Sequence, residues 1–478
     1  MTLPATPPMP LTPAFRTSVL TTLRPALRGA AVLAAAVVLA ACGGAGDDDF
    51  GSCTQTAQKR WVGDMMDEWY FWYRLSPRPN PGSYGDPLSY FDALLYTGTD
   101  PAFPADRWSR SESTESFNRF YGDGATMGYG VAVNGFEVTS GQPLYVRYVE
   151  PASDAAVKGV QRGDEVLSAN GRTAAEMIVA DDFSPLNAAA AGDRLTLQLR
   201  RAGVTRTVVV EARVFNLTPV SGAQVVQSPG GRLIGYLMVK DMIAQAGPGL
   251  DSAFALFRAQ GVQDLVVDLR YNGGGLVSMG ATLASYIAGT RGSAGGTGGG
   301  ARTYAALLYN DKRAGANNQV FRFENRAVAL GVPRVYLLTG PRTASASEQV
   351  INGLRGIDVQ VVTVGDTTFG KPVGSLPQGY CGTTYSAIHF ESANARNEGR
   401  YFDGFDASCR VAEDFTRPTG DTADPLLVAA AHHADNGACP AMLVKPEGAA
   451  ADTPEARAAR AAHRRAWRTD ERSTLLPR

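Results

Sequence analysis

The feature that most constrains the fold is an alternation of strand-like and helix-like runs between residues 216 and about 440. Short apolar runs are each followed by a longer run with helical periodicity. The pairs are RLIGYLMV with GLDSAFALFRAQG, DLVVDLR with LVSMGATLASYIAG, and RVYLLTG with SEQVINGLRG, before a last strand-like VQVVTVG. Strands separated by helices predict an α/β domain with a largely parallel sheet.

Three polar or glycine-rich segments follow predicted strands directly. They are YNGGG (residues 271–275), PRTASASE (341–348) and DTTFGK (366–371). Ligands of open α/β sheets bind outside the carboxyl ends of the strands, so we expect the three segments to open on one edge. Together they offer a hydroxyl, an amine and a flexible backbone turn, which are the nucleophile, base and oxyanion donors of a Ser-Lys hydrolase.

The hydroxyls of TASASE also have a purely structural interpretation. Ser345 stands three residues before Glu348, as in a helix capping box. In the alternative without catalysis, Ser345 only caps a helix and Lys371 is solvated. The two roles are compatible, because free N–H groups and the helix dipole at a first turn can stabilise an oxyanion. We therefore assign Thr343 and Ser347 to structure and Ser345 to chemistry.

Histidine is poorly placed to act as the base. The chain has four His residues, none of them directly after one of these strands, and it has no GxSxG elbow. A lysine can serve instead if burial against apolar neighbours disfavours its ammonium form. Lys371 is flanked by Phe369, Pro372 and Val373, with no adjacent acid. The sequence therefore supports a Ser345–Lys371 dyad better than a Ser-His-Asp triad.

Nucleotide, nucleic-acid and metal sites find little support. GDTTFGK (365–371) matches GxxxxGK, but a phosphate-binding loop next requires Ser or Thr and a helix, whereas Pro372 follows here. A formal net charge of −1 gives no basic footprint for nucleic acid. No cysteine pair has zinc-like spacing and no HExxH occurs. We predict no cofactor, no metal and no nucleic-acid partner.

The N-terminal segment predicts export. Arginines precede the apolar run at residues 29–41, which is too short to span a bilayer comfortably. LAAC, ending at Cys42, resembles a bacterial lipobox, so residues 1–42 are interpreted as a lipoprotein signal peptide with Cys42 lipidated. The alternative is a plain signal peptide with an incidental Cys. Residues 43–52 read as a tether. The expected location is the periplasmic side of the cell envelope, as an outer-membrane lipoprotein held in the membrane by its lipid.

Four further cysteines fit an oxidising compartment. Cys53, Cys381, Cys409 and Cys439 form an even set that allows three pairings. We favour Cys381 with Cys409, the closest pair in sequence, although the sequence alone leaves the pairing open. Residues 441–478 form a low-complexity tail rich in Ala and Arg.

Two regions precede the α/β part. Residues 53–124 look helical, and Trp61, Met65, Trp69 and Trp72 recur near helical spacing as a core stripe. Residues 125–214 look β-rich. There VEPASDAAVKGVQRGDEVLSANG resembles a PDZ domain, with a small helix, a Gly-Asp turn and a strand ending in Asn-Gly.

MGYGVAV (127–133) stands where PDZ domains carry their carboxylate-binding loop. Gly128, Tyr129 and Gly130 would present backbone N–H groups to a peptide's terminal carboxylate. The alternative is a plain hairpin turn.

TASASEQV, DTTFGKPVG and VVDLRYNGGG, together with the PDZ-like insert, resemble the C-terminal processing (tail-specific) protease family. The resemblance spans roughly residues 53–435, with the blocks in family order. It implies a crotonase-like α/β core at residues 215–440, a helical N-terminal part and a PDZ domain over the cleft. It also implies polypeptide substrates that are recognised through their C-termini.

The resemblance assigns roles residue by residue. Ser345 would be the nucleophile of a serine endopeptidase and Lys371 its general base. The backbone N–H groups of Ala346 and Gly274 would form the oxyanion hole. Ser375 stands where many members carry a Gln that orients the lysine, so its role as the orienting group is an expectation only.

Two other positions depart from the family pattern. Gly273 replaces a frequent Pro, and Trp108 stands where some relatives use a His, which favours a dyad over a tetrad. The alternative function is a non-catalytic lipoprotein that binds peptides or small ligands on the same fold.

Overall fold

The computed structural model describes residues 52–135, 137–138, 140–296, 299–441 and 474–476. The predicted signal peptide with Cys42 and nearly all of the tether and tail lie outside these residues. Within the described chain, the order of elements follows the alternation seen in the sequence.

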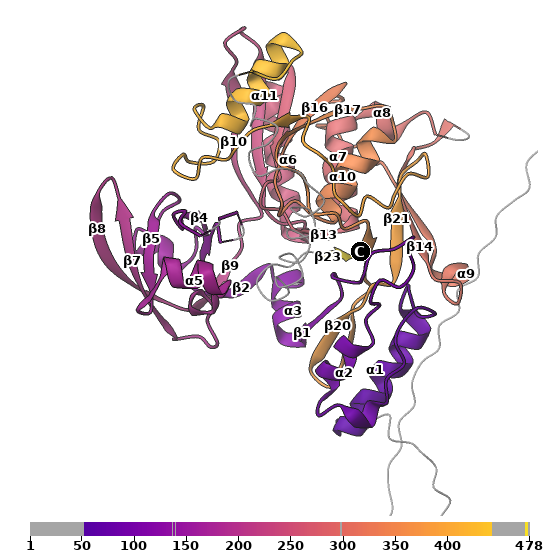
Figure 1. The fold of residues 1–478 in the computed structure, drawn as a ribbon. Helices are drawn as coiled ribbons and strands as arrows, with labels where there is room; N and C mark the ends of the chain where they lie inside the picture. Colours follow the sequence, from indigo (N-terminus) through magenta and orange to yellow (C-terminus); the bar gives the residue numbers. More distant parts are fainter. Residues whose placement is uncertain (1–51, 136, 139, 297–298, 442–473, 477–478) are drawn as a thin grey trace, which may run out of the picture. The chain divides into compact units, whose positions relative to one another are not determined.

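A six-stranded sheet forms the centre of the α/β part, in the order β10-β11-β12-β16-β17-β22 (Figure 1). β10 and β11 are antiparallel, and every other neighbouring pair is parallel. The prediction of an α/β fold with a largely parallel sheet is confirmed. The strands are β10 (Val220–Gln227), β11 (Leu233–Val239), β12 (Asp264–Asp268), β16 (Arg334–Thr339), β17 (Gln360–Gly365) and β22 (Cys409–Arg410).

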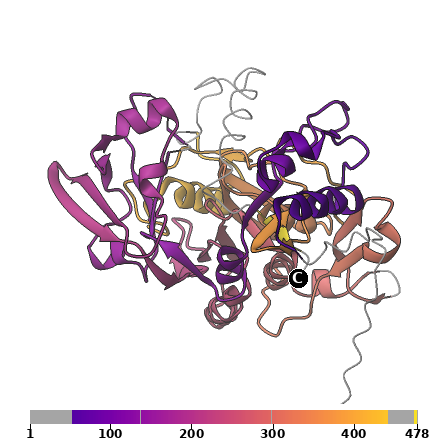
Figure 2. The ribbon, with the colours of Figure 1, turned by 90° about the horizontal axis from the view of Figure 1, so that it is seen from below.

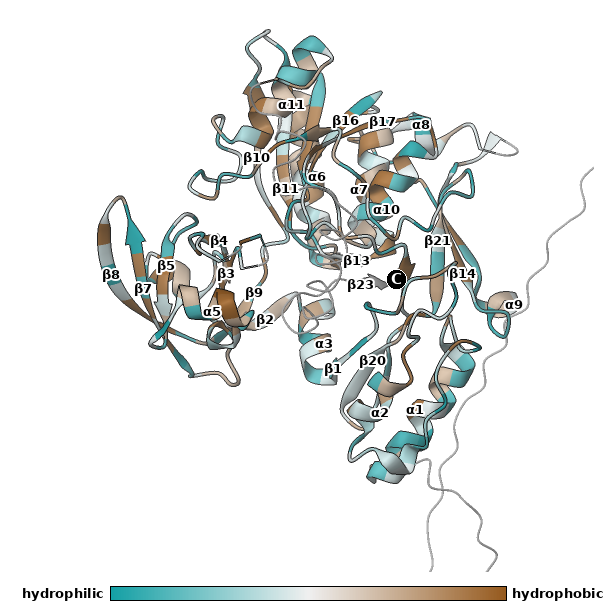
Figure 3. Cartoon of the chain, viewed as in Figure 1, coloured by the Kyte–Doolittle hydropathy of each residue, from teal (hydrophilic) through white to brown (hydrophobic). Residues whose placement is uncertain are grey.

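Helices cover both faces of this sheet, which is why its inner strands β11, β12, β16 and β17 are largely apolar and buried. Alternate strand residues pack against two separate clusters, with Leu237, Val267 and Leu337 on one face and Tyr236, Val266 and Leu338 on the other. Figure 3 shows the hydrophobic colouring of α7 and the strands beside it. The first face carries α6 (Gly247–Ala259), α7 (Val277–Ala288) and α10 (Ala346–Arg355), and the second carries α11 (Pro425–Asn436).

A second, antiparallel sheet has the order β15-β14-β21-β18. Its strand β18 begins two residues after Lys371, so this sheet fixes the chain on the far side of that lysine. Its strands are β14 (Thr303–Tyr309), β15 (Gln319–Arg322), β18 (Val373–Gly374) and β21 (Phe390–Ala393), and nearby elements are η3 (Ala244–Ala246), β13 (Gly274–Leu276), α8 (Thr290–Ser293) and α9 (Ala314–Asn317).

The N-terminal region is helical and aromatic, as predicted, and α1 and α2 lie side by side (Figure 2). The helical stripe is wrong at Trp72. α1 ends at Trp69, and Trp72 is buried in the following turns against Trp108. The elements are α1 (Gln55–Trp69), η1 (Pro81–Ser83), α2 (Pro87–Ala93), β1 (Arg110–Ser113) and α3 (Thr114–Tyr121), with β1 paired to the hairpin β19 (Gln378–Tyr380) and β20 (Thr383–Ser386).

Residues 125–216 form small sheets around an apolar cluster of their own. The predicted small helix and the strand ending in Asn-Gly are both present, and Asn170 and Gly171 take φ of 49° and 83° at the turn. Assignment to the PDZ class remains a prediction. The elements are β2 (Ala125–Gly128), β3 (Val131–Val133), β4 (Val146–Val149), α4 (Asp154–Val157), β5 (Glu165–Ala169), β6 (Arg172–Thr173), α5 (Ala174–Ala180), η2 (Ser184–Leu186), β7 (Arg194–Arg201), β8 (Val204–Glu211) and β9 (Arg213–Asn216).

The disulfides differ from the pairing that we favoured. Cys53 bonds Cys381 and Cys409 bonds Cys439, with Cα–Cα distances of 5.6 and 5.5 Å. Cys381–Cys409 is therefore wrong. Cys381 lies in the β19–β20 turn beside the start of α1, whereas Cys409 lies in β22 of the central sheet, near the end of α11. Proximity in sequence gave the wrong pair because tertiary packing brings the ends of distant segments together.

Candidate active site

The three predicted segments meet at the carboxyl ends of β12, β16 and β17. The Thr343 hydroxyl donates to the Leu269 carbonyl at 2.8 Å, and the Ala344 N–H donates to the Asn272 carbonyl at 3.1 Å. The Phe369 N–H in turn donates to the Thr343 carbonyl at 2.9 Å. These hydrogen bonds tie the glycine turn, the serine loop and the lysine loop into one assembly, as the parallel topology requires.

Ser345 occupies a strained position directly before α10. Its φ of 61° and ψ of −117° are unusual for a residue with a side chain, and such strain is often found at functional sites. The side chain is fully buried, and its Oγ has no hydrogen-bond partner among the described residues. Ser345 and Glu348 form the expected capping box at the start of α10, and the Ser345 N–H donates to Glu348 Oε2 at 2.8 Å.

Lys371 is 2% exposed, and its pKa lies well below the ordinary value of a lysine. Burial is the main cause, and the nearby Arg110 cation lowers the pKa further. The carboxylates of Asp106 and Glu348 act in the opposite direction but do not reverse the shift. The balance favours a neutral amine, which is the form a general base requires.

Glu348 organises the backbone around both residues. Its Oε2 accepts hydrogen bonds from the backbone N–H groups of Ser345 and Lys371, each at 2.8 Å. A single carboxylate oxygen therefore holds the two backbone N–H groups close together. Its Oε1 accepts the Gly370 N–H at 2.7 Å and the Thr368 hydroxyl at 2.6 Å. Burial raises the pKa of Glu348, and these hydrogen bonds offset part of that rise. The sequence marked Glu348 only as a capping residue.

Gly274 lies against the serine loop so closely that no other residue fits. A Cβ there would stand 2.7 Å from the Ser345 Cβ and 2.9 Å from the Ala346 nitrogen, and the φ is +103°. The Gly274 N–H donates to Asn272 Oδ1 at 2.9 Å, and the Asn272 side chain donates to the Val239 carbonyl at 2.9 Å. The predicted oxyanion donor is thus already hydrogen-bonded. The Ala346 N–H belongs to the first turn of α10, where amides lack intrahelical acceptors.

The lysine loop is also held from the N-terminal region, which the sequence did not indicate. Arg107 donates to the carbonyls of Phe402, Phe369 and Gly370 at 2.9, 3.3 and 3.3 Å. Arg110 acts on Lys371 by charge, as described above. Both arginines lie in PADRWSRS. They act on residues more than two hundred positions later in the chain, so the local sequence gives no sign of these interactions.

Two polar residues near the lysine have other partners. The Ser375 hydroxyl donates to the Ser386 carbonyl at 3.1 Å, so orientation of Lys371 by Ser375 remains a prediction. His389 is fully buried just before β21, and burial lowers its pKa to about 3. Its Nδ1 accepts the Leu376 N–H at 3.0 Å, which fixes a neutral ring.

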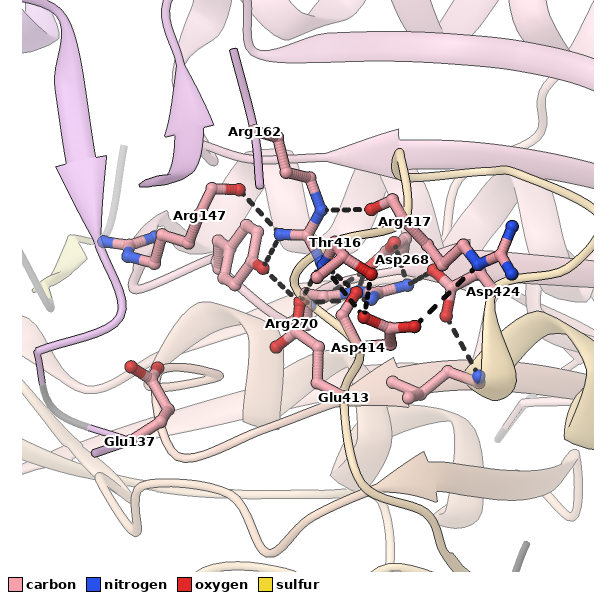
Figure 4. A network of polar contacts seen from close by, with 12 residues as sticks. Glu137, Arg147, Arg162, Asp268, Arg270, Glu413, Asp414, Thr416, Arg417 and Asp424 are labelled. Carbon is pink, nitrogen blue, oxygen red and sulfur yellow. Dashed lines mark hydrogen bonds and ion pairs between the residues drawn. The ribbon is translucent and has the colours of Figure 1, made fainter. Parts of the chain in front are cut away.

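An ionic network surrounds Arg270, which directly precedes the YNGGG segment (Figure 4). Arg270 is buried and pairs with Asp268 at 2.9 Å, Asp424 at 2.6 Å and Glu413 at 3.2 Å. Glu413 also pairs with Arg162 of the β2–β9 region at 2.7 Å and accepts a hydrogen bond from Tyr271. The network anchors the chain that leads from β12 into the glycine turn.

The β2–β9 region also reaches the serine loop. Arg342, three residues before Ser345, forms a bidentate pair with Glu137 at 2.6 and 3.2 Å. Gly128, Tyr129 and Gly130 span the end of β2 and the turn into β3. Gly130 has a φ of +80°, and a Cβ there would lie 2.0 Å from the Ser153 Cβ, so only glycine fits.

Two protein-family models match this chain, one in the α/β part and one in the N-terminal region. Peptidase family S41 matches residues 233–400, which include Gly274, Ser345 and Lys371. The Peptidase S41 N-terminal domain matches residues 57–110, which include Arg107 and Arg110.

Individual relatives carry matching descriptions. Carboxyl-terminal-processing peptidase 3, chloroplastic, of Arabidopsis thaliana is 28% identical over 294 residues, which cover 58% of this chain and 51% of that protein. C-terminal processing peptidase, chloroplastic, of Tetradesmus obliquus is 25% identical over 259 residues, 52% of each chain. The chain spans about half the length of the curated relatives it matches.

The fold agrees with these matches. A crystal structure from Bacteroides fragilis NCTC 9343, described as an S41 protease, superposes with a TM-score of 0.61 at 25% identity. The superposition covers 78% of this chain and 96% of that one. Together with the two matched segments, it shows that these parts of the chain are similar to peptidase family S41 and that the chain shares the fold of that protease.

Proposed function

We propose that the chain is a serine endopeptidase in which Ser345 is the nucleophile and Lys371 the general base. The observation that carries the proposal is the shared carboxylate of Glu348. It accepts the backbone N–H groups of both residues while the Ser345 Oγ has no hydrogen-bond partner among the described residues and the pKa of Lys371 is lowered. A nucleophile and a base need this combination of proximity and protonation state.

The reaction would proceed through an acyl-enzyme. Neutral Lys371 takes the proton of the Ser345 hydroxyl as Oγ attacks the peptide carbonyl carbon. The Ala346 N–H stabilises the oxyanion, and Gly274 contributes its N–H once it is released from Asn272. The protonated lysine then gives its proton to the leaving amine as the C–N bond breaks. Lys371 next takes a proton from water as its oxygen attacks the ester carbonyl carbon. The lysine then returns that proton to the Ser345 Oγ as the C–O bond breaks, which releases the acid product and restores the hydroxyl and the neutral amine.

The PDZ-like region would capture the substrate's C-terminus at Gly128, Tyr129 and Gly130. We expect the purified chain to cleave an unfolded polypeptide with a free C-terminus and to bind its C-terminally amidated form at least about tenfold more weakly, because a charged hydrogen-bond acceptor is lost. The measurements are product analysis and the Kd of fluorescent peptides. Equal affinity for the two peptides would remove C-terminal recognition. Binding without cleavage would favour a binding protein.

The lowered pKa of Lys371 predicts a pH dependence. Activity requires the neutral amine, so kcat/KM should rise with pH through the pKa of Lys371, which lies well below 10.5. Arg110→Gln removes a cation that lowers this pKa, so the rising limb should move to higher pH. Exposed Arg396→Gln is the control and should leave the limb in place. A limb that stays put in Arg110→Gln would contradict the assignment of Lys371 as base.

We assign the protein to the periplasmic side of a bacterial cell envelope, held in the outer membrane through a lipid on Cys42. Two disulfides fit an oxidising compartment. No helix in the described part of the chain is long and apolar enough to cross a membrane. Mass spectrometry of membrane-extracted protein should find a diacylglyceryl group on Cys42. An unmodified N-terminus at another residue would exclude the anchor.

A further inference from the structure

The end of the chain returns to the candidate active site. β23 (Thr474–Leu476) pairs in parallel with β13, opposing Thr474 to Gly274, Leu475 to Gly275 and Leu476 to Leu276. Figure 1 labels β23 next to β13. Gly274 lies so close to Ser345 that a side chain at position 274 would collide with it. β23 therefore runs along the turn that lies against the proposed nucleophile.

The rest of the surroundings of β23 also belong to the site. β23 contacts β18, which begins two residues after Lys371, and α10, which begins one residue after Ser345. The nucleophile helix, the strand after the base and the glycine turn therefore border one extended segment. Polypeptide substrates often bind to a protein as an added strand, because main-chain hydrogen bonds supply affinity without a fixed sequence.

β13 has one edge available for such a strand. On its other edge the Met242 N–H donates to the Gly274 carbonyl at 3.1 Å, and the Leu276 N–H donates to the Met242 carbonyl at 2.7 Å. Because residues alternate along a strand, the N–H and C=O groups of Gly275 face β23. A substrate strand on this edge and β23 would need the same groups of Gly275.

The geometry of the site does not favour cleavage of β23. The Gly274 N–H is bonded to Asn272 Oδ1 rather than presented to a carbonyl. One of the two predicted oxyanion donors is therefore withheld while β23 is in place, and loss of such a donor lowers kcat by about 10²- to 10³-fold in a serine protease.

We propose that β23 is an intramolecular competitor that occupies the substrate strand position on β13 and keeps the peptidase in a resting state. This proposal rests on the proposed function for its effect on rate, but its binding mode can be tested separately. Tethered segments act at effective concentrations in the millimolar range, so even a weak strand interaction can hold much of the protein in this form.

The test compares the full chain with a chain that ends at Ser473. Removing Thr474–Arg478 should raise the initial kcat/KM on an unfolded polypeptide at least about threefold. A synthetic STLLPR peptide should then inhibit the shortened chain competitively. The same peptide N-methylated at Leu476 loses one backbone donor and should inhibit much less. In the full chain, Leu476→Pro removes the same donor and should match the shortened chain.

Three controls make the outcome decisive. Deleting five residues, Gly448–Asp452, shortens the chain equally but keeps β23, so its rate should remain that of the full chain. If the difference in kcat/KM between the full and shortened chains depended on protein concentration, β23 would be acting on a second copy of the chain. That result would overturn an intramolecular role. Intact-mass analysis should show the full chain ending at Arg478 during turnover, because cleavage within residues 474–478 would make the tail a substrate and contradict the proposal.

Binding is measured without turnover. In the shortened chain carrying Ser345→Ala, STLLPR should slow hydrogen exchange at the Gly275 N–H, which faces the β23 position, whereas the N-methylated peptide should not. If no form of the protein cleaves any polypeptide but this protection is observed, the strand site stands and the peptidase assignment fails. If the rates of the full and shortened chains agree and no protection appears, the competitor role is wrong.

Discussion

Replacing Ser345 with Ala is expected to lower kcat/KM on an unfolded polypeptide by about 10⁴-fold or more, because the acyl-enzyme can no longer form. The physical cause is local. The Oγ has no hydrogen-bond partner among the described residues, so its loss removes a reactive atom and little structure. Stability should therefore stay within about 1 kcal/mol of wild type. The assay follows peptide release together with thermal unfolding.

Ser347 provides a matched control in the same helix. Its hydroxyl donates to the Asn272 carbonyl at 3.1 Å and is fully buried. Ser347→Ala should cost about 1 kcal/mol of stability and retain most of the activity. If Ser345→Ala kept more than about a tenth of the wild-type activity, a nucleophilic role would be excluded, because loss of the nucleophile costs a serine protease about 10⁶-fold in kcat.

Replacing Glu348 with Ala is expected to destabilise the fold by about 2–4 kcal/mol and to abolish activity. The carboxylate is fully buried and accepts four hydrogen bonds from the serine and lysine loops. Each donor left unpaired costs about 1–3 kcal/mol. Removing a buried charge offsets part of this cost, and the raised pKa of Glu348 reflects that desolvation. Urea unfolding with intact disulfides measures the change.

The control for Glu348 is Glu324, whose exposed carboxylate pairs with Arg326. Glu324→Ala should change stability by no more than about 0.5 kcal/mol and leave activity unchanged. If Glu348→Ala were folded, fully active and as stable as wild type, Glu348 would not be what sets the backbone positions of Ser345 and Lys371.

The sequence predicted the architecture of the α/β part because topology carries that information. Strands that are buried on both faces and separated by helices form a parallel sheet, and the ends of parallel strands meet at one edge. The meeting of the Thr343, Asn272 and Phe369 loops therefore followed from their positions after β16, β12 and β17.

Features that depend on side-chain contacts between distant segments could not be predicted. The N-terminal region packs against residues more than two hundred positions away, and this packing determines both the Cys53–Cys381 pair and the action of Arg110 on Lys371. The burial of Trp72 depends in addition on where α1 ends. The bond from Gly274 to Asn272 was missed for another reason. Only the backbone orientation of the turn decides whether that amide is presented or withheld.

The Cys53–Cys381 bond determines how a mechanical pull on the chain would be transmitted. The bond connects the residue just before α1 to the turn of the β19–β20 hairpin, 328 residues away. Tension applied to the chain before Cys53 passes through a covalent link into that hairpin, whose strand β20 is also hydrogen-bonded to β1. The force therefore bypasses α1, and unfolding of α1 cannot begin at its first turn while the disulfide is intact. A body tethered at its N-terminal end would hang from a crosslinked hairpin, and reduction of one disulfide would move the load onto a single helix.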